Sequence, residues 1–192
     1  RPAGQGSWNA VGLPGAVFAL RAWAFIGTAS FLPLLFELRG WSSTRQGLVT
    51  GLFWFGGGVA GVVAGAAADR WSRRPVVALT TLSGALLLWR LPIAEGDWVL
   101  PLAMACGALL GAPHSVLMVM AQSLLPVRRG LASGLALGFL FASGALASWA
   151  IGLLADRFGL VPVLQAGALS AAAAAAFSLL LPSSRSSETA EA

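Results

Sequence analysis

Six long apolar stretches dominate this sequence and constrain its fold more than any other feature. Each reaches about 20 residues, the length that an α-helix needs to cross the hydrocarbon core of a bilayer. The stretches are continuous rather than alternating and are longer than the strands of a membrane β-barrel, so helices are favoured over strands. They cover residues 14–36, 47–68, 76–94, 98–121, 131–155 and 160–181.

The composition excludes a water-soluble globular domain. Only 10% of the residues are charged and 57% are hydrophobic, whereas roughly a quarter of the residues of a soluble domain are charged. The sequence therefore predicts an all-α membrane protein, with a transmembrane bundle of six helices over residues 14–181. Residues 1–13 form a polar N-terminal segment or a linker. The Ser- and Glu-rich residues 182–192 are predicted to be a disordered cytoplasmic tail.

The arginines are distributed unevenly between the two ends of the predicted helices. An excess of arginine in short loops marks the cytoplasmic side of a membrane protein. Six helices place both termini on one side, and this side is predicted to be cytoplasmic. Its arginines are Arg1, Arg70, Arg73, Arg74, Arg128, Arg129 and Arg185, and those of the other side are Arg39, Arg45 and Arg157, with Arg90 near that boundary.

Several functional classes are disfavoured. The net charge of +5 comes from scattered arginines, so it does not indicate nucleic-acid binding. Cys106 is the only cysteine and cannot form an internal disulfide. The sequence contains no phosphate-binding loop, no Cys/His metal set and no Ser-His-Asp arrangement, so we predict neither an enzyme nor a cofactor. The chain begins abruptly in a polar stretch at Arg1, which suggests a piece of a longer protein.

The ends of the second and fifth stretches repeat each other. The segment GAAADR at residues 65–70 reappears as GLLADR at residues 152–157, an offset of 87 residues. The same offset pairs Pro75 with Pro162. Each repeat would hold three helices, an odd number, so the two copies run in opposite directions across the membrane. Inverted repeats of this kind are typical of secondary transporters. The alternative is a chance match between helices rich in Gly and Ala.

These residues resemble the major facilitator superfamily, which has a loop motif of the form Gly-x-x-x-Asp-Arg-x-x-Arg-Arg between its second and third helices. Ser72 stands where the family usually has Gly. The residues that match the motif are Gly65, Asp69, Arg70, Arg73 and Arg74. The segments at 20–23, 31–34 and 125–134 are similar to the C-terminal half of the fosmidomycin-resistance-like branch of efflux permeases.

The resemblance implies a twelve-helix transporter with two bundles that works by alternating access, often by proton antiport. This chain would be its C-terminal half and would export a small molecule across a bacterial inner membrane. Its partner would be an N-terminal six-helix half or a second copy of itself, with the substrate near the midplane. The alternatives are a non-transporting membrane scaffold and an inactive fragment.

Arg21 and His114 are the candidate polar residues inside the stretches. Arg21 lies about 10 Å into the first stretch, where charge is costly and by default functional. It is predicted to bind an anionic substrate group or a carboxylate elsewhere, unless it extends to the membrane surface. His114 could carry a proton or bond to a neighbouring helix. No acidic residue lies within any stretch, so a proton-coupling carboxylate would belong to another half.

The loop motif and the aromatic residues supply the other candidates. The loop motif is predicted to act as a gate, in which Asp69 accepts hydrogen bonds in the closed state; the alternative is a simple topology anchor. Aromatic residues within the stretches would line an apolar cavity, face lipid or pack between helices. They are Trp23, Phe25, Trp54, Phe139 and Phe141. Glycines of the second, fourth and fifth stretches would let helix backbones pack closely.

Overall fold

The chain is built almost entirely of helices. A computed structural model describes residues 6–70, 73–124 and 129–180, and this part contains no strand. The α-helices are α1 (Gly6–Ala22), α2 (Thr28–Glu37), α3 (Ser43–Arg70), α4 (Arg73–Arg90), α5 (Val99–Gly111), α6 (Pro113–Leu124), α7 (Arg129–Phe158) and α8 (Leu160–Ser178). The short turns are the π-helical η1 (Trp23–Gly27) and the 3₁₀-helical η2 (Leu91–Ile93) and η3 (Gly96–Trp98).

Six helical segments are long and apolar enough to cross a membrane. The first span joins α1, η1 and α2 without a break, and the fourth joins η3, α5 and α6. The chain is therefore an integral membrane protein by the length and composition of its helices. The described spans are Gly15–Glu37, Ser43–Ala68, Arg74–Ile93, Gly96–Val119, Ser133–Phe158 and Leu160–Ser178.

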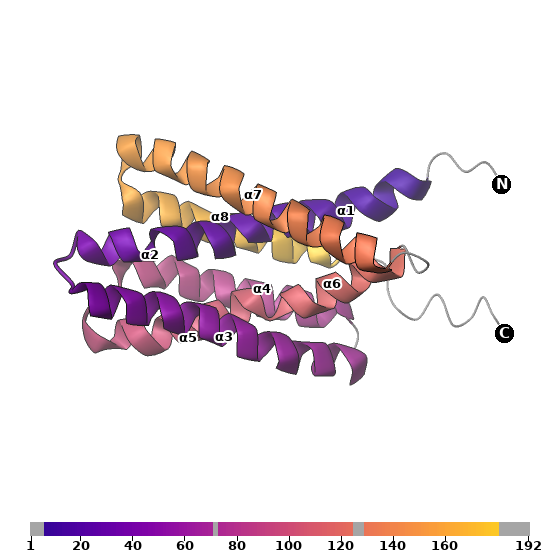
Figure 1. Ribbon diagram of the computed structural model, residues 1–192, viewed down its shortest axis with the longest axis horizontal. Helices are drawn as coiled ribbons and strands as arrows, with labels where there is room; N and C mark the ends of the chain where they lie inside the picture. The colour runs from indigo at the N-terminus through magenta and orange to yellow at the C-terminus, as the bar shows by residue number, and fades with distance from the viewer. Residues whose placement is uncertain (1–5, 71–72, 125–128, 181–192) are drawn as a thin grey trace.

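The helices form one elongated bundle in which consecutive spans run in opposite directions (Figure 1). α3 ends at the end of the bundle where α1 begins, whereas α7 ends at the opposite end (Figure 1). The repeated segments 65–70 and 152–157 form the C-terminal ends of these two helices. The two segments therefore lie at opposite ends of the bundle. This is the arrangement that an inverted repeat of two three-helix units requires.

Most of the buried apolar side chains form one cluster between α2, α3, α4, α5 and α8. α3 packs most extensively on α5, and α4 on α8. Because lipid tails are as apolar as these side chains, close packing rather than water exclusion holds the helices together. The largest side chains that are fully buried in this cluster are Phe36, Phe53, Leu32, Leu88, Leu91, Leu110, Ile151 and Leu164.

Glycines bring the backbones of α3 and α5 into direct contact. A Cβ atom at Gly107 would overlap the backbone of Phe53, and one at Gly111 would overlap the backbone of Gly57. A side chain at either position would push the two helices apart. The predicted role of these glycines in packing is confirmed for this pair of helices.

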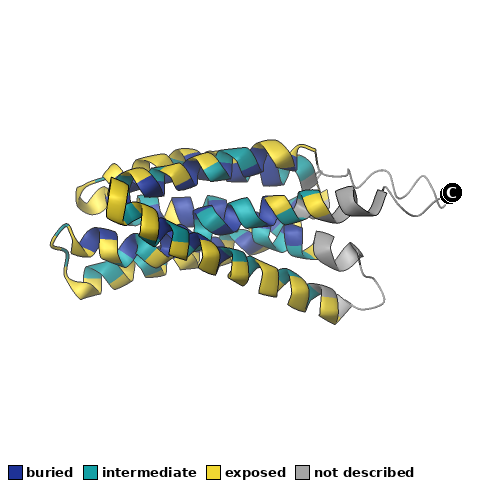
Figure 2. Ribbon diagram, turned by 90° about the horizontal axis from the view of Figure 1, so that it is seen from above, coloured by how far each residue is buried: buried dark blue, intermediate teal, exposed yellow. Residues whose placement is uncertain are grey.

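Three glycines in the first half of α7 do not have this role in the described structure. A Cβ atom at Gly130, Gly134 or Gly138 would meet nothing within 4 Å. The sequence predicted a packing face here, and this is wrong for the described residues, because no atom closely approaches these three glycines, although α7 does contact α1 and α6. Figure 2 shows α7 as the mostly exposed helix that crosses the front of the view.

Two arginines fasten the turns at the end of the bundle where α3 begins. Arg39 donates hydrogen bonds to the carbonyl oxygens of Pro92 and Ala94, the latter at 2.7 Å. Arg45 forms a salt bridge with Asp97. The turn after α2 is thereby joined to the turn before α5. The guanidinium of Arg45 also lies over the ring of Trp41, at 4.3 Å from the ring centre.

Candidate functional site

The π-helical turn η1 interrupts the first span immediately after Arg21. A π-turn adds one residue to a helical turn, and such turns are frequent at functional sites. η1 packs against α7: a Cβ atom at Gly144 would lie 2.7 Å from the side chain of Ile26. On its other side the ring of Phe25 lies 5.0 Å from the ring of Phe53 and 5.0 Å from that of Trp54. Contacts on both sides therefore fix the wide turn in place.

Arg21 is buried inside the bundle, with 3% of its surface exposed. One Nη atom donates a hydrogen bond to the carbonyl oxygen of Leu110, at the end of α5. The Nε–H group is also buried and has no hydrogen-bond partner among the described residues. The interpretation that Arg21 extends to the membrane surface is wrong for this structure, because its side chain turns inward to α5.

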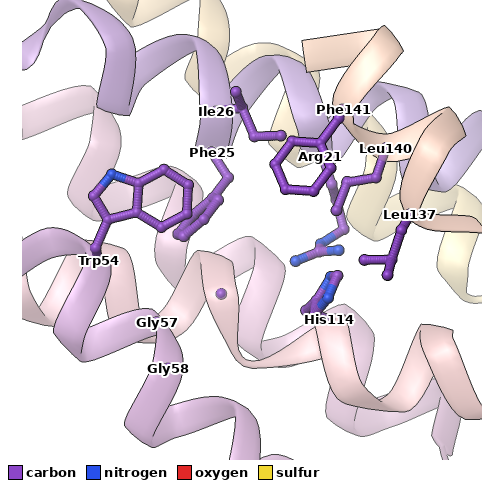
Figure 3. A pocket seen from close by; sticks show the side chains of 11 residues that line it. Arg21, Phe25, Ile26, Trp54, Gly57, Gly58, His114, Leu137, Leu140 and Phe141 are labelled. Carbon is purple, nitrogen blue, oxygen red and sulfur yellow. The ribbon is translucent and has the colours of Figure 1, made fainter.

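The break between α5 and α6 places His114 beside Arg21. Proline lacks a backbone N–H, so Pro113 cannot complete the hydrogen-bond ladder and is tolerated at the start of a helix. α5 ends at Gly111 and α6 begins at Pro113. Figure 3 shows the guanidinium of Arg21 and the ring of His114 extending toward each other between the helices.

A cavity of about 200 Å³ opens between these side chains (Figure 3). Its walls come from the first, second, fourth and fifth spans, so both three-helix units contribute. The lining is apolar except at Arg21 and His114. The lining residues are Arg21, Phe25, Ile26, Trp54, Gly57, Gly58, Gly111, His114, Leu137, Leu140 and Phe141. No acidic residue is among them.

The structure places the predicted pathway residues in different environments. Arg21, Trp54 and His114 line the same cavity. Trp23 instead lines a separate groove between α1 and α7. Phe139 has 47% of its surface exposed and does not line the cavity.

The structure adds apolar residues of η1 and α7 to the cavity wall. Phe25 and Phe141 were among the aromatic candidates, whereas Ile26, Leu137 and Leu140 had no distinguishing feature in the sequence. The residues of α7 recur at the three- and four-residue spacing of one helix face. This spacing is the signal that could have found them.

The loop motif is described only in part. Gly65 lies near the end of α3, where a Cβ atom would make an ordinary contact with Ser115 at 3.8 Å. Arg70 is exposed, and the Nε–H of Arg74 is buried without a hydrogen-bond partner in the described part. The side chains of Asp69 and Arg73 lie outside the described residues. The predicted gate therefore stays a prediction.

No metal centre is found among the described residues. Within residues 6–70, 73–124 and 129–180, no group of three or more His, Cys, Asp or Glu side chains is placed to hold a metal ion. Cys106 is buried in the core and its thiol faces the carbonyl oxygen of Gly84 at 3.9 Å. Arg21 is the buried charged side chain among the described residues, so the cavity beside it is the candidate site.

Comparison with known proteins identifies the family. The family described as Major Facilitator Superfamily matches residues 15–192. The fosmidomycin resistance protein of Escherichia coli (strain K12) is 36% identical over 96 residues, which cover 50% of this chain and 24% of that protein. The uncharacterized MFS-type transporter YfnC of Bacillus subtilis (strain 168) is 35% identical over 110 residues, 57% of this chain and 27% of that protein.

The chain covers about a quarter of the length of each of these two relatives. The match to the family covers nearly the whole chain and includes all six spans of the structure. The helical bundle with its inverted repeat and the matched loop motif agree with it. The chain therefore belongs to the Major Facilitator Superfamily.

Proposed function

We propose that this chain is the C-terminal six-helix half of a permease that moves a small molecule across the membrane by alternating access. The observation that carries this proposal is the cavity around Arg21, inside the membrane-spanning part and lined by both three-helix units. Substrate sites of secondary transporters lie near the midplane, at the interface between structural repeats. A cavity in this position favours a substrate-binding function over a purely structural scaffold function.

The exposed apolar side chains of α3 and α7 support a second bundle as the partner. Both helices contribute residues to the cavity, and both leave large apolar side chains uncovered beside it. Examples are Trp54 and Phe55 on α3 and Phe139 and Phe141 on α7. A second six-helix unit packed on this face would enclose the substrate between two halves. A homodimer of this chain would cover the same face.

The distribution of charge supports cytoplasmic termini. Arg70, Arg73 and Arg74 lie at the end of the bundle where α1 begins, and they outnumber Asp69, the acidic residue of the same segment. At the opposite end, Glu95, Asp97 and other acidic residues offset the arginines. Because positive loops stay inside, this distribution supports termini that both lie in the cytoplasm. For a bacterial chain this corresponds to the inner membrane.

Export is the proposed direction, because one similar protein is named for fosmidomycin resistance. Fosmidomycin is therefore the first compound to test. The chain is expressed in a bacterial strain that lacks its own fosmidomycin exporter, either alone or together with the N-terminal six helices of a related permease. Fosmidomycin tolerance and the efflux of preloaded compound are then measured.

Each outcome of this experiment selects one function. Efflux from cells that express the chain alone supports a homodimeric transporter. Efflux that requires the N-terminal helices supports the proposed half. Chain that is correctly inserted but gives no efflux of fosmidomycin, or of a panel of other small molecules, under either condition would contradict the transport proposal and indicate a scaffold.

A further inference from the structure

The charge of Arg21 has no counter-charge in the described structure. Moving a charged side chain into the apolar core of a membrane costs several kcal/mol, so intramembrane charges are normally paired. The bond from Arg21 reaches a neutral backbone carbonyl, that of Leu110. The acidic residues Glu37, Glu95, Asp97 and Asp156 are exposed at the far end of the bundle. None of them lines the cavity.

The guanidinium of Arg21 also retains unused donors. Arginine carries five N–H donors in a planar fork that matches the oxygens of a carboxylate or a phosphate group. The Nε–H is buried and unpaired among the described residues. A buried donor without a partner costs about 1–3 kcal/mol. An anionic group in the cavity would satisfy this donor and neutralise the charge at the same time.

The rest of the cavity suits an apolar body. Phe25, Trp54 and Phe141 supply aromatic faces, and aliphatic side chains of η1 and α7 complete the wall. The volume of about 200 Å³ exceeds that of an engineered protein cavity of about 150 Å³ that binds benzene. A single aromatic ring with a small charged group therefore fits inside, and a second ring can extend past the exposed side chains of Trp54 and Phe141. His114 stands beside Arg21 and could donate a second hydrogen bond to the same group.

We propose that this cavity binds a molecule with one negative charge on an apolar or aromatic body, and that Arg21 binds the charged group. The inference rests on the proposed transport function, because it names the class of molecule that the transporter would carry. A neutral molecule would leave Arg21 without a counter-charge. A cation would be repelled by it across a few ångströms of apolar medium.

Direct binding tests this inference without requiring transport. The purified chain is placed in lipid nanodiscs, and three probes that share one aromatic body are compared by equilibrium dialysis, with empty nanodiscs subtracted. The probes are naphthoate, the neutral naphthamide and the cationic naphthylmethylammonium. A charge-assisted hydrogen bond contributes about 1.5–3 kcal/mol, so naphthoate is expected to bind about tenfold or more tightly than naphthamide.

Variants identify the residue responsible. Arg21→Gln is expected to weaken naphthoate binding about tenfold or more and to leave naphthamide binding unchanged. Arg21→Lys keeps the charge but not the fork, so it should retain part of the preference. Arg90→Gln is the matched control, because Arg90 is exposed at the far end of the bundle. This variant should behave like the original chain.

Several results would overturn the inference. Equal affinity for naphthoate and naphthamide, or no binding of any probe, contradicts it even if Arg21→Gln fails to fold. An equal loss in Arg90→Gln and Arg21→Gln would assign the preference to general charge. Naphthoate binding that disappears when an N-terminal bundle is added would mean that a carboxylate of that bundle pairs with Arg21.

The two proposals can fail separately. If the chain prefers naphthoate but gives no efflux of any compound, the binding inference stands and the transport proposal is wrong. If cells export neutral or cationic compounds while the purified chain shows no charge preference, the transport proposal stands and the anion inference is wrong.

Discussion

Arg21 donates a hydrogen bond to the backbone carbonyl oxygen of Leu110 and thereby joins the first span to the fourth. The bond crosses between the two three-helix units, beside the cavity that both units line. The side chain of Arg21 thus both lines the cavity and holds the two units together. This relationship makes Arg21 the most informative residue to replace.

Replacing Arg21 with Ala is expected to abolish transport while the amount of inserted protein stays unchanged. Insertion depends on the apolar residues of the whole span, and removing a charge makes it more favourable. In the proposed function, transport depends on the charge inside the cavity. Efflux and membrane-inserted protein are measured in the same cells. Normal efflux in the variant would show that the charge has no part in transport.

Replacing Gly107 with Ala is expected to destabilise the pair α3 and α5. The new methyl group would overlap the backbone of Phe53, and inserting a methyl into a tight contact costs about 1–3 kcal/mol. Gly51→Ala is the matched control, because a Cβ atom there has open space. Thermal unfolding in detergent is measured for both. Equal melting temperatures would contradict the close contact.

The hydrogen bonds of Arg39 are expected to stabilise the fold more than the salt bridge between Arg45 and Asp97 does. Arg39→Gln removes hydrogen bonds from a charged donor to the carbonyls of Pro92 and Ala94, each worth about 1.5–3 kcal/mol. Asp97→Asn removes a salt bridge whose side chains are 43% and 86% exposed, so the expected loss is below about 1 kcal/mol. Unfolding in denaturant should rank Arg39→Gln as the more damaging change.

Replacing Asp69 with Asn is expected to slow turnover more than it weakens substrate binding. The loop motif is predicted to act as a gate in which this carboxylate would accept hydrogen bonds in one closed state. The loss of one charge-assisted bond would change the rate about tenfold. Initial rates and substrate affinity are measured in proteoliposomes. An unchanged rate would indicate that the motif only sets topology.

The fold could be predicted from hydrophobicity, because each span meets the length that a bilayer imposes regardless of its neighbours. The inverted repeat could be predicted from the segments that contain Asp69 and Asp156. The π-turn could not, since the segment from Trp23 to Gly27 carries no residue type that demands one. Its extra residue changes which side chains face the cavity.

The candidate cavity residues were chosen by residue type and not by the helix face on which they lie. This choice found Arg21 and His114, because polar groups are rare inside membranes. It also selected Phe139, which lies two positions from Leu137 and Phe141 but does not line the cavity. On a helix, positions three or four apart share a face and positions two apart do not. The neighbours of α7 in space decide which face is inside.

The main core and the cavity use almost separate sets of side chains. The buried cluster between α2, α3, α4, α5 and α8 includes Phe36 and Phe53. Phe25 is the one cavity residue that packs against it. Gly57 and Gly111 also line the cavity, but they form the close contact between α3 and α5. Substitutions at Leu137, Leu140 and Phe141 of α7, which lie outside the main core, leave that core intact. If this cavity binds the substrate as proposed, changes at these α7 positions can alter specificity while the architecture is inherited unchanged.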